Sequence, residues 1–221
     1  DPVGVLPEVY LVNALIAGNQ LDKAAAAVDA LEKKQPGKPE TYQLKGAVAL
    51  ARQDTVNAQK SFARALAIKP TYYPAVAALN QLDLRRNDPQ SARRRLEAFL
   101  NNDSQNLDAM LDLANLHATT GRIADAMRTL ASALETHPRA VQAYLMLVQL
   151  RLQSGQAQDA VTAAQKASQI SPKDARVLDM LGTAQLATGD AMSAIITFRR
   201  TLELVPQSVP TLLKLSSAYT A

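Results

Sequence analysis

Apolar residues recur along the chain with a period of 34 residues. If each repeat is numbered from 1 to 34, they occupy positions 4, 7, 8 and 11, and again positions 20, 24 and 27 or 28. Both sets have the spacing of one helix face, so the pattern predicts two amphipathic helices in every repeat. The chain is therefore expected to be all-α, built from antiparallel helix pairs. The expected repeats are 5–38, 39–72, 73–106, 107–140, 141–174 and 175–208, followed by the first part of a seventh at 209–221.

Alanine, proline and leucine keep the same register, which a chance pattern would not produce. A small residue at position 20 lets the two helices approach closely, and a proline at position 32 ends the second helix. Lys45 replaces the leucine of position 7 and is expected to direct its charge outward, and Ser104 replaces one proline. The position-20 alanines are Ala24, Ala58, Ala92, Ala126, Ala160 and Ala194, and the prolines are Pro2, Pro36, Pro70, Pro138, Pro172 and Pro206.

The segment between the two helices carries turn and helix-start residues. Asp54, Asp88 and Asp190 stand where the second helix should begin, and aspartate is a favoured N-cap residue. Glycines mark the turn in the last three full repeats, at Gly121, Gly155 and Gly189. Large apolar residues are expected to fill the space between neighbouring repeats, namely Leu11, Phe62, Leu130 and Phe198.

This arrangement resembles the tetratricopeptide repeat family over essentially the whole chain. The family motif matches Tyr42, Gly46, Ala58, Phe62, Ala65 and Pro70 in the second repeat, and Leu181, Gly182, Ala194, Phe198 and Pro206 in the sixth. The resemblance implies a single α-solenoid over 1–221, a right-handed superhelix of stacked helix pairs with an extended concave surface. It also implies a scaffold for protein–protein interactions and not an enzyme.

In the family the concave surface is lined by the first helices, chiefly at positions 2, 5, 9, 12 and 13. Many of the residues at these positions carry amides, which both donate and accept hydrogen bonds and so suit an extended peptide or a sugar chain. The alternative is that they are merely soluble positions on an exposed face. Cochaperone-type recognition of a C-terminal carboxylate is not expected, because Val9 stands where that subtype has lysine, although Asn13 matches. Carried over to this chain, the surface contains Asn13, Gln43, Gln81, Arg85, Asp112, Asn115, Leu145, Gln149, Gln153, Asp179 and Thr183.

Composition excludes several kinds of chemistry. The chain has no cysteine, and its two histidines, His117 and His137, have no acidic or histidine neighbours at metal-ligand spacing. No phosphate-binding glycine loop or catalytic group can be assembled from the sequence, so no cofactor and no metal are expected. With 48% apolar residues and a net charge of +4, the chain can bury a core, and no apolar run approaches the roughly 18 residues of a membrane helix.

Arginines gather in the third repeat, where Arg93, Arg94 and Arg95 are candidate anion-binding residues. A solvated charged face is the ordinary explanation for such a run. The alternative is a module that binds an anionic polymer or lipid headgroups. Nucleic acid is a less favoured ligand, because the aromatic residues typical of single-strand binding are not interleaved with these arginines.

Phrases between Pro70 and Ala114 also resemble the repeat lipoproteins of the bacterial exosortase (PEP-CTERM) system. That resemblance implies a scaffold in an envelope assembly for exopolysaccharide export or protein sorting, in the periplasm or at the outer membrane. A cytoplasmic protein, or the targeting arm of a larger enzyme, remains the alternative. Asp1 and Pro2 fall at positions 31 and 32 of the register, so we expect the sequence to be a piece of a longer array.

Overall fold

The computed structural model describes residues 6–221, and every regular element among them is a helix. Pro2 lies outside the described residues. In chain order the helices are α1 (Leu6–Ala17), α2 (Leu21–Lys34), α3 (Pro39–Ala51), α4 (Thr55–Ile68), α5 (Tyr73–Arg85), α6 (Pro89–Asn102), α7 (Leu107–Thr119), α8 (Ile123–Thr136), α9 (Val141–Gln153), α10 (Ala157–Ile170), α11 (Ala175–Ala187), α12 (Ala191–Leu204) and α13 (Val209–Thr220). The expectation of an all-α chain of helix pairs is confirmed.

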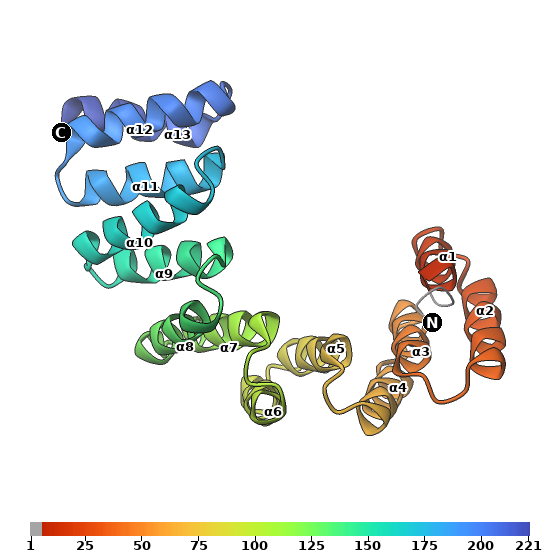
Figure 1. The fold of residues 1–221 in the computed structure, drawn as a ribbon. Helices are drawn as coiled ribbons and strands as arrows, with labels where there is room; N and C mark the ends of the chain where they lie inside the picture. The colour runs from red at the N-terminus through yellow and green to blue at the C-terminus, as the bar shows by residue number, and fades with distance from the viewer. Residues whose placement is uncertain (1–5) are drawn as a thin grey trace. The chain divides into compact units, whose positions relative to one another are not determined.

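Each full repeat contains one odd-numbered first helix and one even-numbered second helix (Figure 1). The contacts divide the described chain into an N-terminal part that ends at Ala109 and a C-terminal part, Met110–Ala221, which are described separately. Within each part a second helix packs against the first helix of its own repeat and against that of the next, as α10 does with α9 and α11. First helices also contact one another, α1 with α3, α9 with α11, and α11 with α13.

The second helices begin where the aspartates predict. Asp54, Asp88 and Asp190 each accept a hydrogen bond from the backbone N–H three residues ahead, at 3.0 Å for Asp54 and 3.1 Å for the other two. These bonds satisfy an N–H that the helix itself leaves unpaired. The pKa of each of these carboxyl groups is lowered, chiefly by a hydrogen bond from the serine hydroxyl at Asp88 and Asp190, and chiefly by the backbone N–H at Asp54.

The second helices end two residues before position 32, whether or not that position is proline. Gln35, before Pro36, has φ −136° and ψ 72°, and Asp103, before Ser104, has φ −139° and ψ 72°. In both cases the N–H of this last residue still bonds to the carbonyl four residues back. The proline is therefore compatible with this helix end but is not required for it, because α6 ends in the same way before Ser104.

The turn between the helices uses a left-handed residue at position 15 of every full repeat. Gly121, Gly155 and Gly189 have φ between 72° and 82°, which confirms that these glycines mark a turn. The first three repeats place larger residues in the same conformation, Asn19 (φ 54°), Gln53 (φ 62°) and Asn87 (φ 58°).

The core of each repeat is closed by a small residue at position 20 and by a size-matched pair at positions 8 and 24. All six position-20 alanines are fully buried. Where position 24 is phenylalanine, position 8 is glycine, and a Cβ on Gly46 or Gly182 would lie only 2.2 Å or 2.6 Å from the ring of Phe62 or Phe198. The pairs in chain order are Val12–Val28, Gly46–Phe62, Asn80–Leu96, Ala114–Leu130, Val148–Ala164 and Gly182–Phe198.

One expected core residue is not buried. Leu11 is 52% exposed, whereas Leu79, Leu113, Leu147 and Leu181, at the same position 7, are buried. Position 7 packs against the second helix of the preceding repeat, and no described helix precedes α1. The expected contact of Leu11 with a preceding repeat therefore stays a prediction, while Phe62, Leu130 and Phe198 are buried as predicted.

Candidate partner-binding surfaces

The predicted concave residues lie on the first helices, and seven of them are exposed. In the C-terminal part the side-chain amides of Asn115, Gln149 and Gln153 make no hydrogen bond with any described residue. Asn115 and Gln149 occupy position 9 on α7 and α9, so the same kind of group recurs from one repeat to the next. In the N-terminal part the exposed members are Asn13, Gln81 and Arg85.

Position 5 lies at the seam between first helices and is not an open surface position. Leu145, predicted to line the groove, is only 9% exposed and belongs to the core of the C-terminal part, so that prediction was wrong. At the same position of the next repeat, Asp179 accepts a hydrogen bond from Thr211 at 2.9 Å and forms an ion pair with Lys214. Both partners belong to α13, which shows that position 5 is directed toward the following first helix.

Two of the remaining predicted residues are partly buried and one is exposed. Thr183 is partly buried, and its hydroxyl donates to the backbone carbonyl of Asp179 at 2.7 Å. Gln43 is also partly buried, and its Oε1 is enclosed without a hydrogen-bond partner among the described residues. Asp112 is exposed on α7. Of the predicted set, the exposed amides are the groups most available to a partner.

The three candidate arginines do not converge on one site. Arg93 forms an ion pair with Glu97 at 2.9 Å, and Arg95 turns inward to α5. There it bonds to Asn80 at 3.0 Å and forms an ion pair with the carboxylate of Asp83, which is 2% exposed. Arg95 thus neutralises a buried charge inside the third repeat, and that role keeps it from serving an external anion.

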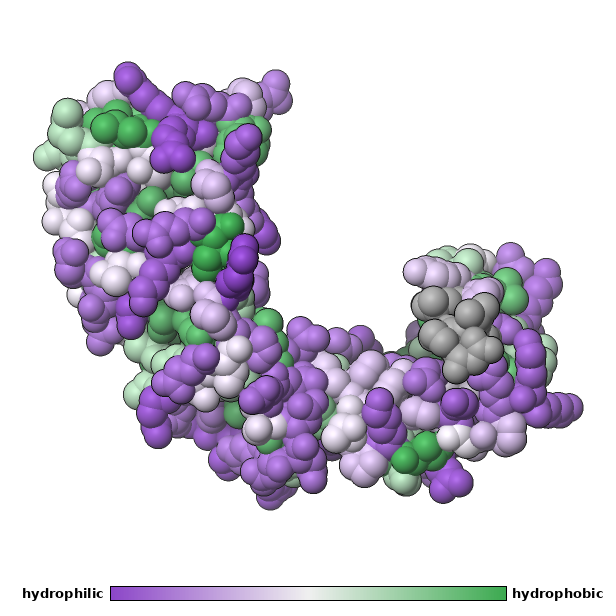
Figure 2. Space-filling view, in the orientation of Figure 1, coloured by the Kyte–Doolittle hydropathy of each residue, from purple (hydrophilic) through white to green (hydrophobic). Residues whose placement is uncertain are grey.

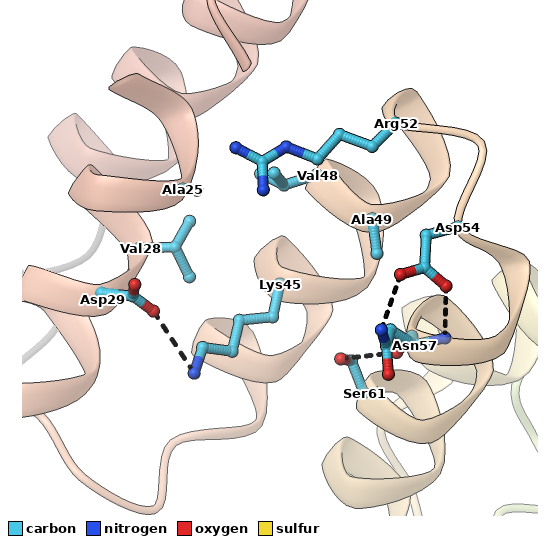
Figure 3. Close-up of a pocket in the computed structure, with 10 residues that line it drawn as sticks. All are labelled: Ala25, Val28, Asp29, Lys45, Val48, Ala49, Arg52, Asp54, Asn57 and Ser61. Atoms are coloured by element: carbon cyan, nitrogen blue, oxygen red, sulfur yellow. Dashed lines mark hydrogen bonds and ion pairs between the residues drawn. The ribbon is translucent and has the colours of Figure 1, made fainter. Parts of the chain in front are cut away.

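A cavity of about 250 Å³ opens between α2, α3 and α4 (Figure 3). Its floor is apolar, and Lys45 crosses one side to form ion pairs with Asp29 at 3.4 Å and with Glu32. The hydrogen bond with Lys45 lowers the pKa of Glu32 and raises that of the lysine. Sequence reasoning missed this cavity, although Ala49, at a position where the tetratricopeptide motif has tyrosine, was a signal that space would be left.

The cavity offers no nucleophile activated for catalysis. Ser61 lines it, but the serine hydroxyl donates to the backbone carbonyl of Asn57 at 2.8 Å, and no histidine is present to act as a base. The charged groups that line the cavity already have partners: Lys45 pairs with Asp29, which also lines it, and Arg52 pairs with Asp22 on α2, outside the lining. The cavity can hold a small polar or amphipathic group, but the side chains that line it do not form a catalytic site.

Within residues 6–221, no group of three or more histidine, aspartate or glutamate residues is placed to hold a metal ion. His117 is buried in the packing position expected for it, and His137 is the residue that ends α8. None of the described helices is both long enough and apolar enough to span a bilayer.

The stacked helix pairs define a repeat protein of the α-solenoid class, and its first helices carry exposed amides. Tetratricopeptide repeat family models match residues 11–73, 83–150 and 145–209, which together cover most of the chain. The chain belongs to the tetratricopeptide repeat family, whose fold binds protein or peptide partners and is generally non-catalytic.

Solved structures of similar fold include PilW, described as a widely conserved type IV pilus biogenesis factor. It is 20% identical, with a TM-score of 0.70 over 99% of this chain and 100% of the other. MamA is 20% identical, with a TM-score of 0.63 over 78% of this chain and 94% of the other. YrrB, described as a TPR protein with an unusual peptide-binding site, is 13% identical, with a TM-score of 0.62 over 84% and 96%.

At these identities the similarity establishes the fold alone. A comparison with curated protein sequences gives no match. The resemblance to exosortase-system lipoproteins finds no support in these comparisons.

Proposed function

We propose that this chain is a non-catalytic scaffold that binds an extended segment of a partner protein along its first helices. The observation that carries the proposal is the set of exposed amides on α7 and α9, at Asn115, Gln149 and Gln153, which have no hydrogen-bond partner within the described chain. Asn13 and Gln81 provide the same chemistry on α1 and α5.

Side-chain amides suit an extended peptide because each offers both donors and acceptors. A peptide in an extended conformation carries backbone N–H and C=O groups that need partners when they leave water. Amides at position 9 of successive first helices can form hydrogen bonds with those backbone groups at regular intervals, and such bonds do not depend on the side chains of the peptide. Specificity would then come from the residues that differ between repeats, such as Arg85 on α5 and Asp112 on α7.

A peptide is favoured over a sugar chain as the occupant. The fold binds peptides in general, and the solved structure of YrrB is described as having a peptide-binding site. Amides can also bind sugar hydroxyls, so a polysaccharide is the outcome to be distinguished in the test.

The wider role we propose is in a bacterial envelope assembly, in the periplasm or at the outer membrane. It rests on the resemblance of the 70–114 segment to exosortase-system repeat proteins and on the fold shared with PilW. Exopolysaccharide export and protein sorting are the processes that this resemblance favours. The competing proposal is the targeting arm of a larger enzyme, in which case the partner would be the substrate of a catalytic domain.

The test begins with peptides selected from a random displayed library on the immobilised wild-type chain. Their affinity is then measured for the variant Asn115→Ala/Gln149→Ala/Gln153→Ala. The matched control is Gln158→Ala/Gln165→Ala, which removes two exposed amides from the second helix α10.

We expect at least a tenfold loss of affinity in the first variant and none in the control. Methylation of one peptide backbone nitrogen should produce a loss of similar size, because it removes a donor. Equal binding to all three proteins would overturn the assignment of this surface. Selection of no peptide, together with binding of an oligosaccharide panel that the first variant abolishes, would replace the peptide with a sugar chain.

A further inference from the structure

Position 12 of the repeat lies on the first helix and carries an apolar residue in all six full repeats. None of the six, all of which lie within the described part of the chain, is fully buried, and Leu84 on α5 is 47% exposed. Single partly exposed apolar residues are ordinary, but burial in the core does not account for a type that recurs six times where burial is incomplete. The residues are Ile16, Leu50, Leu84, Ala118, Leu152 and Leu186.

Position 12 lies beside the exposed amides of position 9, because residues three apart share one face of a helix. In the C-terminal part Leu152 follows Gln149 on α9, and Leu186 follows Thr183 on α11. Both leucines are partly buried, so each leaves part of its side chain open to a ligand that lies against the amides. We call Ala118, Leu152 and Leu186 the position-12 row.

The position-12 row advances from one first helix to the next. Helices α9 and α11 are in contact, and on the next pair of first helices Thr211 of α13 donates to Asp179 of α11 at 2.9 Å. The axes of helices packed side by side are separated by roughly 8–10 Å. Successive members of the row are therefore expected to lie about 8–10 Å apart.

This distance distinguishes between the conformations of a bound peptide. Side chains on one face of a β-strand recur at about 6.6 Å and then at about 13 Å, and neither interval matches the row. A polyproline II helix has three residues per turn and rises about 3.1 Å per residue, so every third side chain lies on one side at intervals of about 9.3 Å. The row therefore matches polyproline II and not a strand.

The amides favour the same conformation over an α-helix. The backbone groups of an α-helix are bonded to one another and leave a neighbouring amide without a partner. A polyproline II helix has no internal hydrogen bonds, so its carbonyl groups can accept from the side-chain N–H groups of Asn115 and Gln149. In the view of Figure 2 the apolar surface of the C-terminal part lies as separate areas among hydrophilic surface, which suits a ligand whose apolar contacts are spaced apart.

We propose that the partner segment bound along the first helices is a polyproline II helix with an apolar residue at every third position. This inference rests on the proposed function and narrows it from an extended peptide in general to one conformation and one spacing. Every third side chain covers a member of the position-12 row, and the amides of position 9 bond to the peptide backbone between these contacts.

The probe is a fluorescent synthetic peptide of four Leu-Pro-Pro triplets. One companion has the same composition with its leucines in adjacent pairs, a second consists of Leu-Gly-Gly triplets, and a third alternates leucine with threonine. All four carry the same hydrophilic tail, and their binding to the whole chain is measured by fluorescence anisotropy. We expect the paired-leucine and alternating peptides to bind at least fivefold more weakly than the Leu-Pro-Pro peptide. The Leu-Gly-Gly peptide should bind at least threefold more weakly, because a flexible chain loses more conformational freedom on binding.

The variant Leu152→Ser/Leu186→Ser removes the large members of the position-12 row. Its matched control is Leu204→Ser on the second helix α12, where the leucine is 42% exposed. We expect at least fivefold weaker binding of the Leu-Pro-Pro peptide by the first variant and unchanged binding by the control. Leu152→Met/Leu186→Met keeps the row apolar and should bind within twofold of the wild type. Circular dichroism checks the fold of each variant, and if the serine variant does not fold, the comparison of peptides on the wild type decides.

Equal affinity for the paired-leucine peptide, or unchanged binding by a folded serine variant, would overturn the proposal. If none of the four peptides binds while library-selected peptides bind through the amides, the polyproline II inference fails and the proposed function stands. If no selected peptide binds either, both fail.

Discussion

Replacing Gly182 with alanine adds one methyl group at the closest approach of α11 and α12. The added Cβ would lie 2.6 Å, 2.8 Å and 3.0 Å from Cε1, Cδ1 and Cζ of Phe198. Carbon atoms in contact prefer roughly 3.5–4.0 Å, so the ring or the backbone has to move by about 1 Å. Phe198 is fully buried, so its ring cannot move out into solvent without opening the core.

Two opposing effects set the size of the change. Overpacking of this kind costs about 1–3 kcal/mol. Alanine is a better helix former than glycine by roughly 1 kcal/mol, which offsets part of that cost. Because the contact is far below van der Waals distance, we expect the upper part of the range to apply, for a net loss of about 1–2 kcal/mol.

The fourth repeat shows how the loss should be reversed. It pairs Ala114 with Leu130 at the same two positions, and both residues are fully buried. The double variant Gly182→Ala/Phe198→Leu rebuilds that pair in the sixth repeat. Phe198→Leu alone leaves a cavity and should cost about 1–2 kcal/mol. In the double variant the two losses should largely cancel.

Guanidinium denaturation of the wild type, both single variants and the double variant gives a double-mutant cycle. We expect an interaction free energy of roughly 2–3 kcal/mol in favour of the double variant, at the upper end of the range seen for residues in contact. Near-zero coupling, with the two single effects adding to within about 0.5 kcal/mol, would refute the size-matching explanation. Since repeat arrays can unfold in parts, the transitions should be followed both by circular dichroism and by a fluorophore attached near α12.

Three further outcomes are expected from changes elsewhere in the chain. Arg95→Met should destabilise the N-terminal part by about 2 kcal/mol, because the buried carboxylate of Asp83 then keeps only its ion pair with the more exposed Arg86, while Arg94→Met should change stability by less than about 0.5 kcal/mol in the same urea titration. Gln53→Gly should raise stability by about 0.5–1 kcal/mol, because φ at this residue is 62°, and an unchanged denaturation midpoint would contradict the strain assigned to it. The pKa of Asp190 is lower in the folded state, so its charged form stabilises the fold above the unfolded pKa, and this stability is lost as the pH falls through the folded pKa. Asp190→Asn should therefore lessen the dependence of Tm on pH between about 5 and 3. An unaltered pH dependence of Tm would contradict this prediction.

The period of the sequence was sufficient to predict the elements of the fold. Position 20 is alanine in all six full repeats, and each of those alanines is fully buried. The aspartates of the turns start helices because the cap depends on a backbone N–H only three residues away. Helix starts and the repeat boundaries can therefore be predicted from a single sequence, because neither depends on which residues are brought close by folding.

The neighbours of a side chain could not be predicted in the same way. Leu145 and Asp179 share position 5, and the family pattern assigned both to the groove. In the structure this position meets the next first helix, so Leu145 is buried and Asp179 is bonded to α13. Arg95 was read with its sequence neighbours as part of a cationic run, yet its partner Asp83 lies on another helix.

Departures from the repeat pattern fall into two groups, according to whether the chain itself compensates for them. Gly182 is matched by Phe198, Lys45 by Glu32, and the buried Asp83 by Arg95, so each of these departures is explained within its own surroundings. Met192 and Ile196 have no such compensation, since their side chains extend into solvent from positions that are otherwise mostly polar. In a repeat protein the neighbouring repeats supply the reference for what an exposed position ordinarily contains. A departure in one repeat does not indicate what would cover it, whereas the apolar residue kept at position 12 of every full repeat provides a regular spacing with which a partner can be matched.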